Sequence, residues 1–214
     1  MRDSAAASDA SRVTRAQSCA ASASAGVSQE PPTQATLGSA RNSRAFCAVT
    51  PPVALACIEA IAREVPEAVI GAGTVRSAAD AQAAALAGAR FAVSPGYTHA
   101  VGRACHELGL ALLPGVATGS EIMMAQEDGY TALKFFPALQ AGGAAMLKAW
   151  HGPFNDVKFC PTGGVTVQNA REFLALPNVA CVGGSWLTPA DALAAQDWAR
   201  VTRLAAEAAA LSRK

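Results

Sequence analysis

Two hydrophobic patterns alternate along the chain from residue 51 to its end. Short, continuously apolar runs are typical of strands that are buried on both faces of a parallel sheet. Between these runs, apolar residues recur at the period of an amphipathic helix, first over 53–64 and last after Pro189. The expected strands are 68–75, 90–95, 110–115, 132–137, 156–161 and 179–182.

Several expected helices begin at residues that are typical N-caps. Ser77 and Thr98 each precede a helical stretch, so that a side-chain oxygen is available for the first free amides. Thr118 and Glu121 have the spacing of a capping box. We therefore interpret Glu121 as a capping carboxylate rather than a catalytic acid.

Strict alternation of strands and helices indicates an α/β fold with a parallel sheet covered by helices. An open doubly wound sheet and a (β/α)₈ TIM barrel both have this pattern. The barrel is favoured because candidate functional residues follow nearly every strand instead of gathering at one crevice. A barrel needs eight strands, and six are recognisable here, so the first two βα units are missing from the pattern.

Residues 1–50 differ from the rest of the chain. They are rich in Ala, Ser and Arg, contain no aromatic residue before Phe46, and follow no regular period. A disordered leader and an organelle transit peptide are two interpretations of this composition. We expect an atypical segment over 1–50 and one barrel domain over 51–214.

Composition excludes several classes of partner. The net charge is +1 and no Lys/Arg cluster is present, which argues against nucleic acid. No apolar run has the length of a membrane helix. The six cysteines are dispersed without metal-binding spacing. We expect a cytoplasmic protein with no metal, no cofactor, and a small molecule as its ligand.

Lys134 interrupts the apolar run 132–137. A buried strand seldom tolerates an unpaired charge, and desolvation increases the fraction of free amine. A free amine is the nucleophile that Schiff-base catalysis requires. The alternative is a lysine that reaches solvent from the strand end. The other lysines, Lys148, Lys158 and Lys214, lie in a helical pattern, at a strand start and at the C-terminus.

Glycine pairs follow the last two expected strands, each beside a hydroxyl residue. Glycine lets backbone amides approach an anion closely, and barrels frequently bind phosphate at these two loops. Ordinary turn chemistry is the alternative explanation. The two loops contain Thr162, Gly163 and Gly164, and Gly183, Gly184 and Ser185.

Six motifs follow one another from about residue 53 to the C-terminus. They are Gly71-Ala-Gly-Thr-Val75, Val93-Ser-Pro-Gly96, Leu113-Pro-Gly115, Leu133-Lys-Phe-Phe-Pro137, Phe159-Cys-Pro-Thr-Gly-Gly164 and Val182-Gly-Gly-Ser-Trp186. Together they resemble the bacterial 2-keto-3-deoxy-6-phosphogluconate and 4-hydroxy-2-oxoglutarate aldolases. The resemblance implies a (β/α)₈ barrel, usually a homotrimer, that cleaves a phosphorylated 2-keto acid to pyruvate and glyceraldehyde 3-phosphate without a metal.

The resemblance also implies roles for individual residues. Lys134 is the expected Schiff-base lysine. Thr74, Pro95, Phe136 and Thr162 are expected to line the pyruvoyl end of the substrate. The two glycine pairs and Ser185 are expected to hold the phosphate.

One departure from the family concerns catalysis. The family carries a Glu-[Val/Ile]-Thr-Leu-Arg strand whose glutamate is the general acid/base, and this chain lacks the motif. Counted back from Thr74, the glutamate and arginine positions fall near Phe46 and Thr50. We hypothesise that 1–50 is partly read in a shifted frame, and expect severely reduced cleavage. A non-catalytic phospho-ligand-binding remnant, and aldolases for 4-hydroxy-2-oxoglutarate or the galactonate-derived epimer, are the alternatives.

Overall fold

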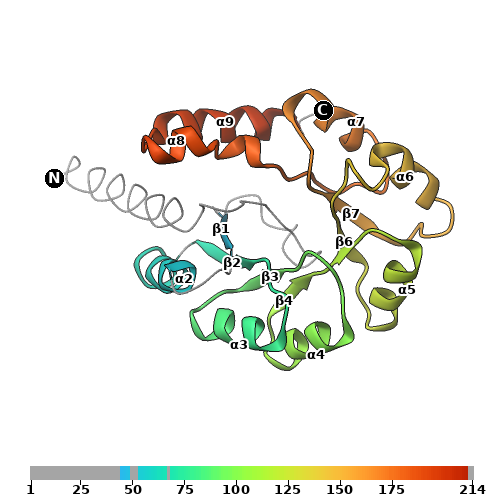
Figure 1. Cartoon of the computed structure of the whole chain (residues 1–214), viewed down its shortest axis with the longest axis horizontal. Helices are drawn as coiled ribbons and strands as arrows, with labels where there is room; N and C mark the ends of the chain where they lie inside the picture. The colour runs from blue at the N-terminus through green and yellow to red at the C-terminus, as the bar shows by residue number, and fades with distance from the viewer. Residues whose placement is uncertain (1–43, 49–52, 67, 212–214) are drawn as a thin grey trace.

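The computed structural model describes residues 44–48, 53–66 and 68–211. In this part of the chain, strands and helices alternate, and the strands line the inner side of an arc whose outer side is covered by helices (Figure 1). The strands are β1 Arg44–Ala48, β2 Val69–Gly73, β3 Phe91–Val93, β4 Ala111–Leu113, β5 Gly115–Val116, β6 Ala132–Phe135 and β7 Lys158–Pro161. The helices are α2 Val53–Glu64, α3 Ala78–Leu86, α4 His99–Glu107, α5 Gly119–Glu127, α6 Gly143–Trp150, α7 Val167–Leu174, the 3₁₀ turn η2 Ser185–Leu187, α8 Ala190–Ala194 and α9 Trp198–Leu211.

All strand pairs among the described residues are parallel. One sheet has the order β1-β2-β3-β4 and the other has the order β5-β6-β7. Pro114, which has no N–H to donate, separates β4 from β5, so the two sheets are successive halves of one curved wall. The wall is not closed into a ring within the described ranges. The expected parallel α/β fold is confirmed, whereas the closed barrel stays a prediction.

Apolar side chains of the strands form two clusters on opposite faces of the wall, as the period of a β-strand requires. The face toward the helices includes Ile70, Ala72, Ala92, Leu112, Leu133, Phe135 and Phe159. The inner face carries a smaller cluster of Phe91, Val93, Leu113 and Cys160, with Val69, Ala111, Ala132 and Cys181 against it. Cys160 of β7 and Cys181 of the following segment therefore belong to the apolar interior.

β1 is a strand that the hydrophobic pattern did not predict. Its five residues, Arg44–Ala48, show no alternation of their own, and they are ordered by parallel pairing along the whole of β2. Tertiary pairing has therefore overridden a weak local preference. The rest of the segment 1–50 lies outside the described residues.

The predicted strand 179–182 is wrong in extent. Only an isolated bridge joins Val179 to Phe159 of β7. The Ala180 amide donates to the Phe159 carbonyl at 3.0 Å, and the Gly183 amide donates to the Pro161 carbonyl at 3.1 Å. The segment thus follows β7 closely without forming a regular ladder.

The predicted helix caps are confirmed. The Asp80 amide donates to Ser77 Oγ, and the Val101 amide donates to Thr98 Oγ1. Thr118 and Glu121 form a complete capping box. Oε2 of Glu121 accepts the Ala117 amide at 2.7 Å and the Thr118 amide at 2.9 Å. Glu121 therefore has the structural role expected from its spacing.

Among the helices in these ranges, none has both the length and the apolar character needed to cross a lipid bilayer.

Gly71 is predicted to be intolerant of a side chain. A Cβ at this position would overlap the ring of Phe91, which is buried on the adjacent strand β3. We expect Gly71→Ala to lower the free energy of unfolding by about 1–3 kcal/mol, the usual effect of overpacking. Urea denaturation measures this change.

Gly152→Ala is the matched control, because Gly152 is exposed and a Cβ there would meet no atom within 4 Å. Equal effects of the two substitutions would contradict the packing argument.

Candidate active site

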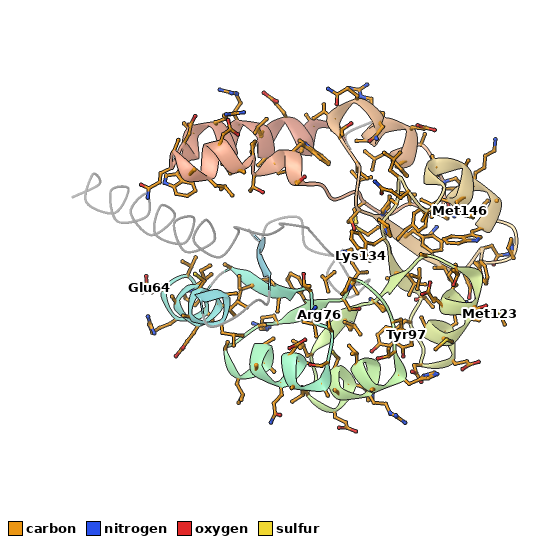
Figure 2. The ribbon with its side chains drawn as sticks, in the orientation of Figure 1. Glu64, Arg76, Tyr97, Met123, Lys134 and Met146 are labelled. Carbon is orange, nitrogen blue, oxygen red and sulfur yellow. The ribbon has the colours of Figure 1, made fainter. Side chains whose placement is uncertain are left out.

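Lys134 lies on β6 and belongs to the inner face of the wall. Its neighbours Leu133 and Phe135 belong to the helix-facing cluster, and alternation along the strand directs Lys134 the opposite way. Figure 2 shows Lys134 inside the arc of strands, where its residue is 6% exposed. Its amide donates to the Pro114 carbonyl at 2.8 Å, and this bond joins the two sheets. The interpretation of Lys134 as a solvent-reaching lysine is wrong.

Burial changes the chemistry of the Lys134 amine. Desolvation disfavours the ammonium form and lowers the pKa of Lys134 to about 8, while the nearby Cys160 thiol acts weakly in the opposite direction. Nζ also lies 4.5 Å from the centroid of the Phe136 ring, a contact that favours the charged form. Desolvation has the larger effect, so a useful fraction of the amine is nucleophilic near neutral pH.

Thr162 directly follows β7, whose last residues Cys160 and Pro161 pair with Lys134 and Phe135 of β6. Its amide donates to the Phe135 carbonyl at 2.9 Å, and its carbonyl accepts the Ala138 amide at 2.7 Å. The side-chain hydroxyl is fully buried and has no hydrogen-bond partner among the described residues. Buried hydroxyls are normally paired, so this one is available to a polar group of a ligand.

The first glycine loop packs against Phe136. Gly163 and Gly164 both have positive φ angles, 87° and 77°, which glycine adopts without strain. The Gly163 carbonyl accepts the Leu139 amide at 3.0 Å, and a Cβ at Gly163 would lie 3.1 Å from the Phe136 ring. Lys134, Phe136, Thr162 and Gly163 are therefore brought together at one end of β6 and β7.

The second glycine loop is connected to the first through the end of β7. The Gly183 amide is used within the protein, because it donates to the Pro161 carbonyl. A Cβ at Gly184 would overlap the Trp186 ring, and Ser185 is exposed at the start of η2. A Cβ at Gly184 would also lie 2.8 Å from the carbonyl oxygen of Val165, the residue after the first loop, and the phosphate-binding role of both loops stays a prediction.

Thr74 and Pro95 follow β2 and β3. Thr74 has a φ of 59°, which is unusual for a residue with a side chain and costs about 1–3 kcal/mol. Strained backbone of this kind is frequent at functional sites. The Pro95 carbonyl packs closely on Gly115, and a Cβ at Gly115 would overlap this carbonyl. Since Gly115 is the partner of Lys134 across β5 and β6, Pro95 is coupled to the lysine by backbone packing.

This arrangement of a buried lysine and glycine-containing strand ends was compared with known proteins. The family model "KDPG and KHG aldolase" matches residues 32–204. The chain belongs to this family.

Members of this family are class I aldolases, which are carbon–carbon lyases. A curated relative, the 2-dehydro-3-deoxy-phosphogluconate aldolase of Pseudoalteromonas atlantica, is 52% identical over 157 residues, 73% of each chain.

Two solved aldolase structures have the same fold. KDPG aldolase from Legionella pneumophila, with pyruvate captured as a covalent carbinolamine intermediate, has a TM-score of 0.73 and 45% identity, and covers 75% of this chain and 78% of its own. The Zymomonas mobilis enzyme with 3-phosphoglycerate has a TM-score of 0.73 and 41% identity, and covers 80% of each chain.

Sequence reasoning gave no role to Ser94, which the structure links to the strand beside Lys134. Its residue is 1% exposed, and Oγ accepts the Gly115 amide at 3.3 Å, directly beside the register position of Lys134. A polar residue at the end of an apolar strand was the available signal. Its partner could not be inferred, because the two residues are distant in sequence.

The position of the family's catalytic glutamate falls on β1. Phe46 pairs in register with Gly71 of β2, and the strand Arg44–Ala48 contains no Asp or Glu. Across the described ranges, no group of three or more His, Cys, Asp or Glu residues could hold a metal ion. The strand on which the family's glutamate is expected therefore carries no carboxylate.

The lowered pKa of Lys134 predicts the pH dependence of imine formation. The protonated amine cannot attack a carbonyl, so reductive trapping of pyruvate on Lys134 should increase with pH and level off above about pH 8. An unperturbed lysine would instead reach half its maximal rate near pH 10.4. Peptide mass spectrometry of samples quenched between pH 6 and pH 11 measures the profile.

Lys148 is exposed on α6, and its labelling in the same samples shows how the reaction of the reagent with an exposed lysine depends on pH. A half-maximal rate at Lys134 near pH 10 would show that burial does not activate the amine.

Proposed function

We propose that this protein is a Schiff-base aldolase that cleaves 2-dehydro-3-deoxy-6-phosphogluconate to pyruvate and glyceraldehyde 3-phosphate. The observation that carries the proposal is the Lys134 amine, buried on the inner face of β6 with a lowered pKa. Its environment fits a 2-keto acid: Phe136 lies on one side, and the Thr162 hydroxyl, which has no partner within the described ranges, lies at the end of the next strand.

The chemistry follows from the amine. Nζ of Lys134 attacks the C2 carbonyl of the substrate to give a carbinolamine, and loss of water gives an iminium ion. The iminium accepts the electron pair of the C3–C4 bond as the C4 hydroxyl loses its proton, which releases the aldehyde. The remaining enamine is protonated at C3, and hydrolysis of the imine then releases pyruvate and restores the amine.

We assign the remaining predicted residues to binding. The Thr162 hydroxyl donates to the carboxylate of the pyruvoyl group, and Phe136, Pro95 and Thr74 shape the apolar side of the pocket. The Gly163–Gly164 and Gly183–Ser185 loops bind the phosphate. Relatives captured with covalent pyruvate and with 3-phosphoglycerate support both halves of this assignment.

The family description supports 4-hydroxy-2-oxoglutarate as a second substrate. This compound presents the same 2-keto acid to Lys134 but has a carboxylate in place of the phosphate. The galactonate-derived epimer differs only at C4, beyond the atoms that Lys134 and Thr162 engage. Comparison of kcat/KM for the three compounds assigns the substrate.

The proposal includes a closed (β/α)₈ barrel and a homotrimer in the cytoplasm. The parallel halves β1-β2-β3-β4 and β5-β6-β7 and the outer layer of helices support the barrel. The trimer and the location rest on the family resemblance. Size measurement by light scattering tests the trimer.

We further infer that turnover is slow, because β1 carries Phe46 where the family has its general acid/base. A shifted reading frame over part of 1–50 remains our hypothesis for this difference. The coding DNA tests it. Absence of a Glu-x-Thr-Leu-Arg segment from both alternative frames would refute it.

The direct test of the proposed function is borohydride reduction in the presence of pyruvate. A reduced pyruvate adduct is expected on the peptide that contains Lys134, since the iminium is trapped as a stable secondary amine. Lys134→Arg is the control, because it keeps a charge but cannot form the imine. No adduct on the folded protein would reject a Schiff-base aldolase, and an adduct without cleavage would indicate a ligand-binding remnant.

Replacement of Phe46 by glutamate should restore activity. The register Phe46–Gly71 puts this position beside β2, whose end carries Thr74. A general acid/base contributes about 10²- to 10⁴-fold, so Phe46→Glu should increase kcat by about 10²-fold or more. A coupled assay for pyruvate measures the rate.

Phe46→Gln has the same shape as Phe46→Glu but cannot transfer a proton. Equal rates for the two variants would show that the missing carboxylate does not limit cleavage.

A further inference from the structure

A cluster of polar aromatic side chains lies outside the site described above, between α4 and the end of α5. The Tyr97 hydroxyl donates to the Asp128 carboxylate, and Nδ1 of His99 lies 2.6 Å from Oδ2 of the same carboxylate. Tyr97 is 6% exposed, and its ring meets the Tyr130 ring edge-on at 5.6 Å. Asp128 thus holds two residues from the connection that leads into α4.

Neighbouring contacts leave Tyr97 little freedom. The Tyr130 hydroxyl donates to the Gly102 carbonyl at 3.2 Å, and a Cβ at Gly102 would overlap the Tyr97 hydroxyl. Burial and the bond to Asp128 raise the pKa of Tyr97, while the bonds from Tyr97 and His99 lower the pKa of Asp128. The phenol therefore remains a donor and Asp128 a charged acceptor, which makes this a charge-assisted hydrogen bond.

The connection that these contacts hold leads directly to the active site. Residues 94–98 join β3 to α4, and at their other end Oγ of Ser94 accepts the Gly115 amide while the Pro95 carbonyl packs on Gly115. Gly115 is the register partner of Lys134. Because the strand wall is interrupted at Pro114, these contacts from 94–98 support the lysine strand where the ladder is broken.

We propose that Asp128, Tyr97 and His99 form a clamp that positions residues 94–98, and through Ser94 and Gly115 the lysine strand, for imine formation. The three are positioning residues, since none of them contacts Lys134 among the contacts described. The inference rests on the proposed function of Lys134 as the Schiff-base residue.

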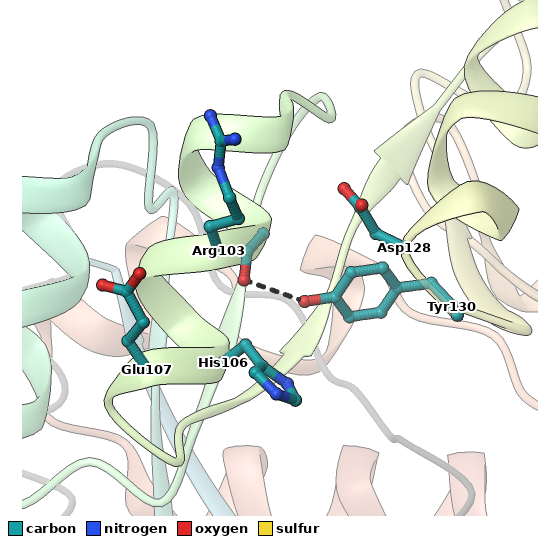
Figure 3. Close-up of a pocket in the computed structure, with 7 residues that line it drawn as sticks. Arg103, His106, Glu107, Asp128 and Tyr130 are labelled. Carbon is teal, nitrogen blue, oxygen red and sulfur yellow. Dashed lines mark hydrogen bonds between the residues drawn. The ribbon is translucent and has the colours of Figure 1, made fainter.

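The outer side of the clamp is open to solvent. A pocket of about 460 Å³ lies against it and is lined by α4 and by the turn between α5 and β6 (Figure 3). Its lining residues are Gly102, Arg103, His106, Glu107, Asp128, Gly129 and Tyr130. The Tyr97 ring is itself part of the apolar core, and Tyr97→Phe keeps this ring while it removes only the hydroxyl, so function and stability can be separated by mutation.

The test compares two phenols in the same cluster. Tyr97→Phe removes the bond to Asp128, whereas the control Tyr130→Phe removes the bond to Gly102 and leaves the clamp in place. We expect Tyr97→Phe to slow reductive trapping of pyruvate on Lys134 about threefold to tenfold at saturating pyruvate. The pyruvate concentration at half-saturation should change little. Tyr130→Phe should leave both quantities unchanged.

A double-mutant cycle tests whether the clamp acts as a unit. Asp128→Ala should reproduce the effect of Tyr97→Phe, Asp128→Asn should retain part of the rate because its amide oxygen still accepts, and the double variant Tyr97→Phe with Asp128→Ala should lose no more. Glu107→Gln, in the same pocket, is a second control. Additive losses, or equal losses in the controls, would overturn the proposal.

Hydrogen exchange separates this proposal from the proposed function. Faster exchange of the Gly115 amide in Tyr97→Phe, but not in Tyr130→Phe, is expected whether or not the wild-type protein forms an adduct. Absence of a pyruvate adduct on the wild-type protein would reject the proposed aldolase function but not the clamp. Unchanged exchange at Gly115 would reject the clamp.

Discussion

The structure depends on the exclusion of water from one lysine amine. An ammonium group is disfavoured in an apolar interior, and the inner face of the strand wall carries the apolar cluster of Phe91, Val93 and Leu113. The amine responds by losing its proton more readily. The larger helix-facing cluster holds the strands in place. Its packing therefore offsets the cost of keeping the Lys134 amine away from water.

Much of this could be predicted from the sequence because the signals are local. The caps at Ser77, Thr98 and Thr118 depend on spacings of three residues, and the single lysine in an apolar run is the buried Lys134. β1 could not be predicted, since its order comes from pairing with a strand more than twenty residues away. The bond between Ser94 and Gly115 was hidden for the same reason.

The hydrophobic pattern also overestimated the length of the strand after α7. Its apolar residues suggested a strand, yet the chain there forms one bridge and then turns into glycines whose packing against Trp186 leaves no room for a side chain. The apolar residues of a segment predict that its backbone is extended. How many of them pair in a sheet depends on the neighbouring strand. Family membership identifies the class of enzyme, and β1 itself carries no carboxylate.

The hydroxyl of Thr162 has a consequence for selectivity. A buried polar atom without an internal partner disfavours any ligand that brings only apolar surface to it, because its hydrogen bond stays unmade. A site built in this way discriminates strongly against analogues that lack the matching polar group. Simple aldehydes and methyl ketones could still reach the amine, but they would leave the hydroxyl unsatisfied. If Lys134 acts as proposed, a keto acid that pairs with this hydroxyl would therefore be preferred over a plain carbonyl compound.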